Sequence, residues 1–326
     1  MKPIFCLLLL GLTVACRRDP NSIGAKPIPN YGWSLRSDLQ DNIQYYAVHF
    51  ADKKTGWLVG SSGTIKSSTD GGETWVSQTS GVQSTLWEIQ FTNGRNGWSC
   101  GHDNSFLRTT DGGENWDKIE VPNASPGIFV GMAFADANNG WLSNNQGELL
   151  KTTDGGLNWQ IAKRDNPYGA RLSIFDENTV YAFSGKLYRT YDGGATWDSL
   201  EVPFLHDYSF WVMSFPDPDH GFLPTINGTG GTILTEYPVL ITRDGGNSWF
   251  SSDSLRDGNL GFTAMFFSDD QNGWVAGNGI YGTQDGGASW EMQYSGIIAP
   301  RDMDFIDQTL GWLLTRDGRV YQYGEQ

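Results

Sequence analysis

Aspartate is the chemically competent residue whose spacing stands out in this chain. Six aspartates recur within one eight-residue phrase, at successive intervals of 41, 43, 38, 52 and 41 residues. They are Asp70, Asp111, Asp154, Asp192, Asp244 and Asp285. Carboxylates are the groups that acid–base catalysis or calcium binding would use. The residues around each aspartate therefore have to show whether its role is chemical or structural.

The phrase around each aspartate has the composition of a tight hairpin. Ser or Thr stands two residues before the Asp, Gly-Gly follows it, and a Trp ends the phrase. The carboxylate can accept hydrogen bonds from the N–H groups of its own turn, and Gly-Gly can adopt positive φ angles. We therefore expect the six aspartates to be structural turn locks, and each Trp to pack on a neighbouring unit.

A second element recurs ahead of each phrase and sets the number of units. It is an apolar strand ending in Phe, a short acidic turn and Gly-Trp opening another strand, as in AVHFADKKTGW at 47–57. Counting LSIFDENTVY at 172–181, where Tyr181 replaces the Trp, gives seven such units. Repeats of about forty residues with short alternating strands indicate stacked supersecondary units. The prediction is an all-β, seven-bladed β-propeller of four-stranded antiparallel blades.

The two ends of the chain are expected to share the last blade. The seventh unit stops after RDGRVYQY at 316–323 without a phrase of its own, whereas Tyr31-Gly32-Trp33 looks like the end of one. A ring closed by mixing the termini leaves few exposed strand edges. We therefore expect the N-terminal strand to supply the outer strand of the seventh blade, within a propeller over residues 30–326.

The phrase resembles the Asp-box (BNR) repeat, which occurs in sialidases, sortilin-type receptors, two-propeller glucanases and photosystem II assembly factors. GWLVGSSGTIKSSTDGGETW at 56–75 is most similar to the photosystem II assembly-factor family. That resemblance implies a single seven-bladed propeller acting as a non-catalytic scaffold for a membrane-protein partner. The family's basic binding patch would be represented here only by Arg171 and Arg301.

The first residues indicate export. MKPIFCLLLLGLTVAC has one cation and an apolar core too short for a stable transmembrane helix. It resembles a lipoprotein signal over residues 1–15 with lipid on Cys16, and an ordinary secretory signal is the alternative. Residues 16–29 are then a tether, and Arg17 favours the outer membrane. With Cys16 lipidated, Cys100 has no partner and is expected to be a buried hydrophobic residue.

Composition limits the partners. The chain holds 22 Lys and Arg against 37 Asp and Glu, a net charge of −15. This balance argues against nucleic acid and against anionic membrane patches, so membrane contact is expected only through the lipid. PDPDHG at 216–221 and SDDQNG at 268–273 gather carboxylates without the spacing of a metal loop. Turn chemistry explains them better, and we expect no metal, no cofactor and a monomer.

The residues that the repeat does not explain indicate a candidate binding surface. Aligning the seven innermost strands on their Phe places one ring of residues four positions before it: Tyr46, Trp87, Val130, Arg171, Trp211, Thr263 and Arg301. Glu88 and Asp302 follow one position further in. Of the fourteen Trp, only Trp87 and Trp211 are unexplained by the repeat. The ring is therefore a candidate site, with packing at the channel mouth as the alternative.

An insertion on the same face and the absence of catalytic motifs complete the prediction. Residues 226–238 lengthen one connection and could form a lid, although neutral drift would also explain them. The Arg-Ile-Pro signature of sialidases is absent, and one propeller cannot build the two-domain cleft of the glucanases. The favoured function is a non-catalytic, lipid-anchored scaffold of the bacterial envelope that binds a protein. The alternative is a glycan-binding or glycoside-hydrolase propeller.

Overall fold

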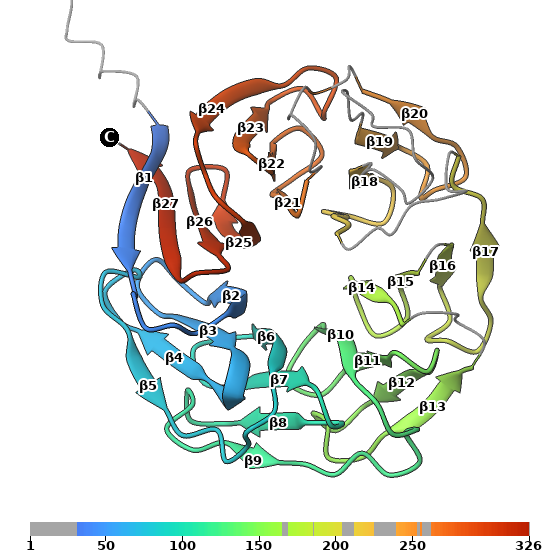
Figure 1. The fold of residues 1–326 in the computed structure, drawn as a ribbon. Helices are drawn as coiled ribbons and strands as arrows, with labels where there is room; N and C mark the ends of the chain where they lie inside the picture. The colour runs from blue at the N-terminus through green and yellow to red at the C-terminus, as the bar shows by residue number, and fades with distance from the viewer. Residues whose placement is uncertain are drawn as a thin grey trace, which may run out of the picture. The chain divides into compact units, whose positions relative to one another are not determined.

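The computed structural model describes residues 31–164, 169–184, 186–203, 212–224, 239–252, 255 and 262–325. These residues form seven antiparallel sheets that stand as blades of a ring (Figure 1). The predicted all-β, seven-bladed propeller is confirmed. The first strand of each blade lies at the centre of the ring and the last at its rim. Residues 1–30, with the predicted signal, tether and Cys16, lie outside the described part of the chain.

The first four blades follow one another along the chain. Blade 1 comprises β2 (Tyr45–Phe50), β3 (Gly56–Gly60), β4 (Ile65–Ser68) and β5 (Val76–Gln78), with a short 3-10 turn, η1, at Ser61–Gly63. Blade 2 comprises β6 (Leu86–Phe91), β7 (Gly97–Gly101), β8 (Phe106–Thr109) and β9 (Asp117–Lys118). Blade 3 comprises β10 (Phe129–Phe134), β11 (Gly140–Asn144), β12 (Leu149–Thr152) and β13 (Gln160–Lys163). Blade 4 comprises β14 (Arg171–Ile174), β15 (Val180–Phe183), β16 (Leu187–Thr190) and β17 (Asp198–Leu200).

Three further blades complete the ring. Blade 5 comprises β18 (Gly221–Pro224), β19 (Val239–Thr242) and β20 (Phe250–Ser251), and a bridge from Ser214 to Phe222 marks its innermost segment. Blade 6 comprises β21 (Ala264–Phe267), β22 (Gly273–Ala276), β23 (Gly279–Thr283) and β24 (Glu291–Ser295). Blade 7 comprises β25 (Pro300–Asp307), β26 (Leu310–Thr315), β27 (Arg319–Glu325) and, from the other end of the chain, β1 (Tyr31–Asp38).

The seam in blade 7 lies where the sequence placed it. Strand β1 pairs antiparallel with β27, with Trp33 opposite Tyr323. The Trp33 ring meets Phe305 edge to face, at 5.7 Å between centroids and 84° between planes. The Trp of a complete phrase makes the same contact, for example Trp116 on Phe91. Trp33 therefore ends the phrase of the seventh blade, as predicted.

Aromatic stacks join most pairs of adjacent blades. Trp57 of blade 1 lies flat on Phe91 of blade 2, at 3.5 Å between centroids and 10° between planes. The other face of the Phe91 ring is close to Gly97, which has no side chain to displace it. The Trp57 indole N–H donates to the carbonyl of Gly112, in the phrase of blade 2, at 3.0 Å. The interface between blades 1 and 2 thus combines a ring contact with one directional hydrogen bond.

The Asp of each phrase accepts the hydrogen bonds of its own turn. In blade 3, Asp154 Oδ1 accepts from the Thr152 hydroxyl and the Asn158 N–H, both at 2.9 Å. The Gly156 N–H donates to the Thr152 hydroxyl at 2.9 Å. Gly155 and Gly156 have φ angles of 73° and 88°, which explains why the turn uses two glycines. The other five phrases repeat the hydroxyl and N–H contacts.

Two other features of the fold bear on the sequence predictions. Cys100 is a free thiol and fully buried within β7. In the described part of the chain no helix has the length and apolar character needed to cross a membrane.

Gly97→Ala tests the interface stack. A Cβ at this position would lie 2.3 Å from a carbon of the Phe91 ring. We expect the free energy of unfolding to fall by about 1–3 kcal/mol, because the crowded ring must move. Gly94→Ala is the matched control, since nothing lies within 4 Å of its Cβ position. Equal stability of the two variants in urea unfolding would contradict the role assigned to the stack.

Asp154→Ala tests the turn lock. We expect a loss of about 1–3 kcal/mol in the free energy of unfolding, because the Asn158 N–H and the Thr152 hydroxyl lose their acceptor. Glu114→Ala, at an exposed position of the equivalent turn in blade 2, should change the stability by less than about 0.5 kcal/mol. Partner binding by folded Asp154→Ala should equal that of the wild type. Weaker binding at unchanged stability would assign the turn a direct role in function.

Candidate binding site at the channel mouth

A β-bulge in four innermost strands positions the predicted ring. The register shifts in β2, β6, β10 and β25. The extra residues are Tyr46, Trp87, Val130 and Arg301. A bulge leaves one residue outside the ladder and redirects its side chain. These four side chains therefore leave the regular alternation where the strands begin, at the mouth of the central channel.

An aromatic stack with a cation on its face lies at one side of the mouth. The Tyr46 and Trp87 rings are stacked, 5.0 Å between centroids and 26° between planes. Arg301 lies over both rings, with its guanidinium carbon 4.9 Å from the centre of Tyr46 and 5.4 Å from that of Trp87. His102 stacks on Trp87 at 5.7 Å. The Trp87 indole nitrogen is buried and has no hydrogen-bond partner among the described residues.

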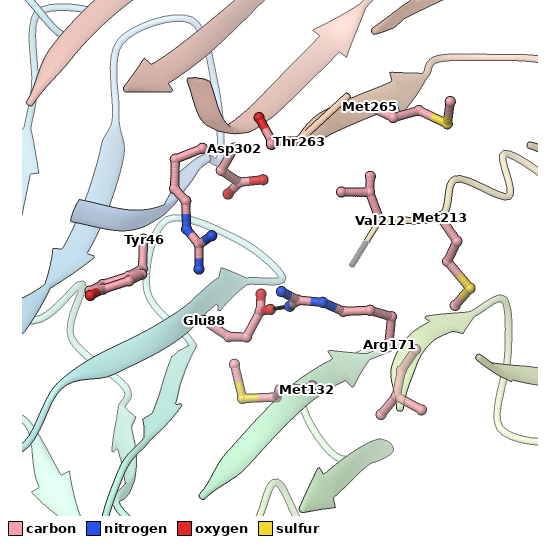
Figure 2. A pocket seen from close by; sticks show the side chains of 12 residues that line it. Tyr46, Glu88, Met132, Arg171, Val212, Met213, Thr263, Met265 and Asp302 are labelled. Atoms are coloured by element: carbon pink, nitrogen blue, oxygen red, sulfur yellow. Dashed lines mark ion pairs between the residues drawn. The ribbon is translucent and has the colours of Figure 1, made fainter. Parts of the chain in front are cut away.

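An ion pair crosses the mouth from blade 4 to blade 2. The guanidinium of Arg171 on β14 pairs with the carboxylate of Glu88 on β6, as the dashed line in Figure 2 marks. Arg171 also donates to the Val130 carbonyl of blade 3 at 3.2 Å. Burial lowers the pKa of Arg171 to about 10, and the positive charge of Arg301 adds to this effect. The guanidinium nevertheless stays charged at neutral pH, so the pair is ionic.

Asp302 and Asp304 join blade 7 to blade 1. Asp302 accepts from the Val48 N–H at 2.9 Å, and Asp304 accepts from the Phe50 N–H at 2.7 Å. His49 lies 3.2 Å from Asp304 and 2.8 Å from the Phe91 carbonyl. Burial opposes a charge on His49, but the charge and hydrogen bond of Asp304 outweigh it and raise its pKa. These carboxylates thus satisfy backbone groups that no neighbouring strand reaches.

Burial is also the main influence on Asp302 itself. It raises the pKa of this carboxyl to about 7, although the hydrogen bond from Val48 and the charge of Arg171 favour the ionised form. The negative charge of Asp304 acts in the same direction as burial. Asp302 is therefore only partly ionised at neutral pH.

Neutral side chains do the same at other interfaces. Gln90 of blade 2 forms two hydrogen bonds with the backbone of Phe134 in blade 3, at 2.8 and 3.0 Å. Ser214 accepts from the Phe267 N–H, and Thr263 donates to the Pro300 carbonyl. The channel is thus lined by polar groups that already have backbone partners. The residues most available to a ligand are those at the mouth.

A cavity of about 180 Å³ opens at this mouth. Its lining includes five of the predicted site residues: Tyr46, Glu88, Arg171, Arg301 and Asp302. Trp87 borders the site through its contacts with Tyr46 and Arg301. Trp211 and the insertion at 226–238 lie outside the described residues. The described part of the chain has no group of three or more His, Cys, Asp or Glu that could hold a metal ion.

Sequence reasoning missed three features of the site. His102 continues the aromatic stack from a strand-connecting turn, and the Arg171–Glu88 pair joins blades that are not adjacent. Met132, Met213 and Met265 line the cavity and stand two residues before the aligned Phe in their blades. That regularity was visible in the sequence, and inspecting the position two before each Phe would have found it.

This chain is similar in sequence to known proteins. Residues 30–166, less than half of the chain, match the family model of the photosystem II assembly factor YCF48. A chloroplastic photosystem II stability/assembly factor, HCF136 of Oryza sativa subsp. japonica, is 29% identical over 131 residues. That alignment covers 37% of this chain and 27% of the rice protein. The chain is an Asp-box propeller similar to the photosystem II assembly factors.

Solved structures extend the similarity to the whole ring. YCF48 bound to D1 peptide superposes with a TM-score of 0.73 at 21% identity, covering 92% of this chain and 99% of that one. A GH74 xyloglucanase from Xanthomonas campestris gives 0.69 at 12% identity, covering 89% of this chain and 53% of the enzyme. At these identities the structural likeness to both shows the fold alone.

Asp302→Asn tests the electrostatics of the channel mouth. Because the folded-state pKa of Asp302 lies above its ordinary value, the folded chain holds an extra proton between about pH 4 and 7. The free energy of unfolding of the wild type should therefore fall as the pH rises through this window. The Asn variant can still accept from Val48 but does not titrate. Its urea-unfolding free energies should show a smaller fall, and an equal fall would contradict the assignment.

Proposed function

We propose that this chain is a non-catalytic, lipid-anchored propeller of the bacterial envelope that holds a protein partner at the channel mouth. The observation that carries the proposal is the stack of Arg301, Tyr46 and Trp87. Tyr, Trp and Arg are the residues that most often dominate binding energy at protein interfaces. Here one residue of each type meets the others beside a cavity, and the regular strand pattern does not require these residue types at their positions.

The electrostatics of the stack leave the Arg301 guanidinium available to an anionic group of a ligand. Within the described residues no carboxylate lies within 4.0 Å of the Arg301 guanidinium, whereas Arg171 is paired with Glu88. Burial lowers the pKa of Arg301 and the nearby charge of Asp302 opposes that effect. A partly buried guanidinium held on two ring faces is preorganised for a planar or anionic group of a partner. The similarity to YCF48, solved with D1 peptide bound, supports a polypeptide as that partner.

The cellular setting of the proposal rests on the N-terminal sequence. The apolar run before Cys16 and the small residues leading to it support lipidation at that thiol. Such a modification attaches several acyl chains, and several chains hold a protein on a bilayer far more firmly than one. The partner is then a protein of the same envelope, reached from an outer-membrane anchor.

Crosslinking in intact envelopes tests partner binding. A Tyr46→Ala/Trp87→Ala variant should lose the protein captured by the wild type, because the platform under Arg301 is gone. Phe250→Ala is the matched control. Phe250 is an exposed aromatic residue on β20 with Arg243 at 5.0 Å over its ring, but it lies on an outer strand. Retained crosslinks on a folded double variant, or loss on the control as well, would overturn the assigned surface.

A hydrolytic role is the competing function, because the GH74 xyloglucanase has the same propeller fold. Glycosidases use a pair of carboxyl groups flanking the scissile bond. At this mouth Glu88 is paired with Arg171, and Asp302 accepts from the Val48 backbone. Incubation of the wild-type chain with xyloglucan, followed by analysis of reducing ends, decides between the two. Release of reducing ends that is lost in Asp302→Asn would overturn the non-catalytic proposal.

A further inference from the structure

The lining of the mouth is divided into two chemically distinct halves. Tyr46, Glu88 and Asp302 lie on one side of the cavity in Figure 2, and Val212, Met213 and Met265 lie on the other. The first group comes from blades 7, 1 and 2, and the second from blades 5 and 6. Met132 of blade 3 lies below the Arg171–Glu88 pair (Figure 2) and adds a further apolar side chain to the lining.

The apolar half is unusually rich in methionine. Met132, Met213 and Met265 are three of the six methionines in the chain, and all three line this cavity. Met303 occupies the equivalent position in blade 7 and, like Met132 and Met265, is buried in a core between blades, but it does not line the cavity. Methionine is flexible and polarisable, so it is suited to surfaces that must adapt to different apolar groups.

We propose that the methionine half receives one apolar side chain of the partner, next to an acidic group that Arg301 binds. This inference rests on the proposed function and specifies the ligand: a polypeptide segment with adjacent apolar and acidic residues. A cavity of about 180 Å³ matches one large side chain, since an apolar cavity of roughly 150 Å³ accommodates benzene. Two large side chains would not fit together.

The charges at the mouth determine the sign of the second group. Glu88 and Arg171 neutralise one another, and burial leaves Asp302 only partly ionised. Within the described residues, Arg301 is the cation of the lining that no carboxylate approaches within 4.0 Å. Its position over Tyr46 and Trp87 sets the guanidinium in the half of the mouth formed by blades 7, 1 and 2. An acidic neighbour is therefore the complement that this arrangement selects.

Methyl NMR on the full chain labelled with ¹³C-methyl methionine tests the inference directly. The probe is the blocked hexapeptide Gly-Gly-Asp-Leu-Gly-Gly, compared with versions carrying Ser for Leu or Lys for Asp. The methyl signals of Met132, Met213 and Met265 should shift saturably with the first peptide. Affinity for either changed peptide should fall about tenfold or more, because one apolar burial or one ionic hydrogen bond is lost.

The chain supplies internal controls for this titration. Met292 is 54% exposed on the outer strand β24, and Met303 is buried away from the cavity. Neither methyl signal should move. The inference is overturned if no signal shifts saturably, if Met292 responds as strongly as the cavity methionines, or if the Ser peptide binds as well as the Leu peptide.

A second variant separates this inference from the proposed function. Met213→Gln keeps the side-chain length but puts an amide in the apolar half, and Met292→Gln is its control on the outer strand. In the envelope crosslinking experiment Met213→Gln should lose most of the partner, and Met292→Gln should retain it. If Tyr46→Ala/Trp87→Ala loses the partner but a folded Met213→Gln keeps it, protein binding stands and the apolar subsite is wrong. If both retain it, the proposed function fails.

Discussion

The stacking of one aromatic ring on the innermost-strand Phe of the next blade is the contact on which the structure depends. It recurs as Trp98 on Phe134, Trp274 on Phe305 and Trp312 on Phe50, at 3.6–4.0 Å between centroids. Blades in a propeller share no strand ladder, so side chains must set their spacing. Because the last of these contacts joins blade 7 to blade 1, the same interaction that stacks the blades also closes the ring.

Because adjacent blades share no strand ladder, the channel-facing edge of each innermost strand has backbone N–H and C=O groups that no neighbouring strand pairs. Buried N–H and C=O groups require partners, and residues such as Asp304, Gln90 and Ser214 supply them across three of the gaps. Polar residues in the channel are consequently explained by the architecture. The bulged residues are different, because a bulge takes a residue out of the backbone ladder and redirects its side chain, and no gap between inner strands requires the stack that these side chains form. Function is therefore expected at the mouth, where the bulges lie, rather than within the channel.

The sequence predicted the blade count, the seam and much of the ring, because each depends on a local pattern that repeats. Aligning the innermost strands on their Phe selected Tyr46, Trp87 and Arg301 without knowledge of the bulges. It could not predict that Arg171 reaches Glu88, since that pair joins blades 4 and 2 and exists only in the closed ring. Nor could it show that Asp302 accepts from Val48, a residue 254 positions away. Such contacts follow from ring closure and not from local spacing.

The distribution of charge sharpens the division between scaffold and site. The six Asp locks stand in turns opposite the mouth and are six of the 37 acidic residues of a chain whose net charge is −15. At physiological ionic strength charges are screened over about 8 Å, so these distant carboxylates scarcely oppose an acidic group at Arg301. The charged groups that line the mouth with Arg301 matter more: the Arg171–Glu88 pair, whose charges cancel, and Asp302, which is only partly ionised. An acidic protein can thus bind an acidic segment, provided that its cations are concentrated where the partner enters.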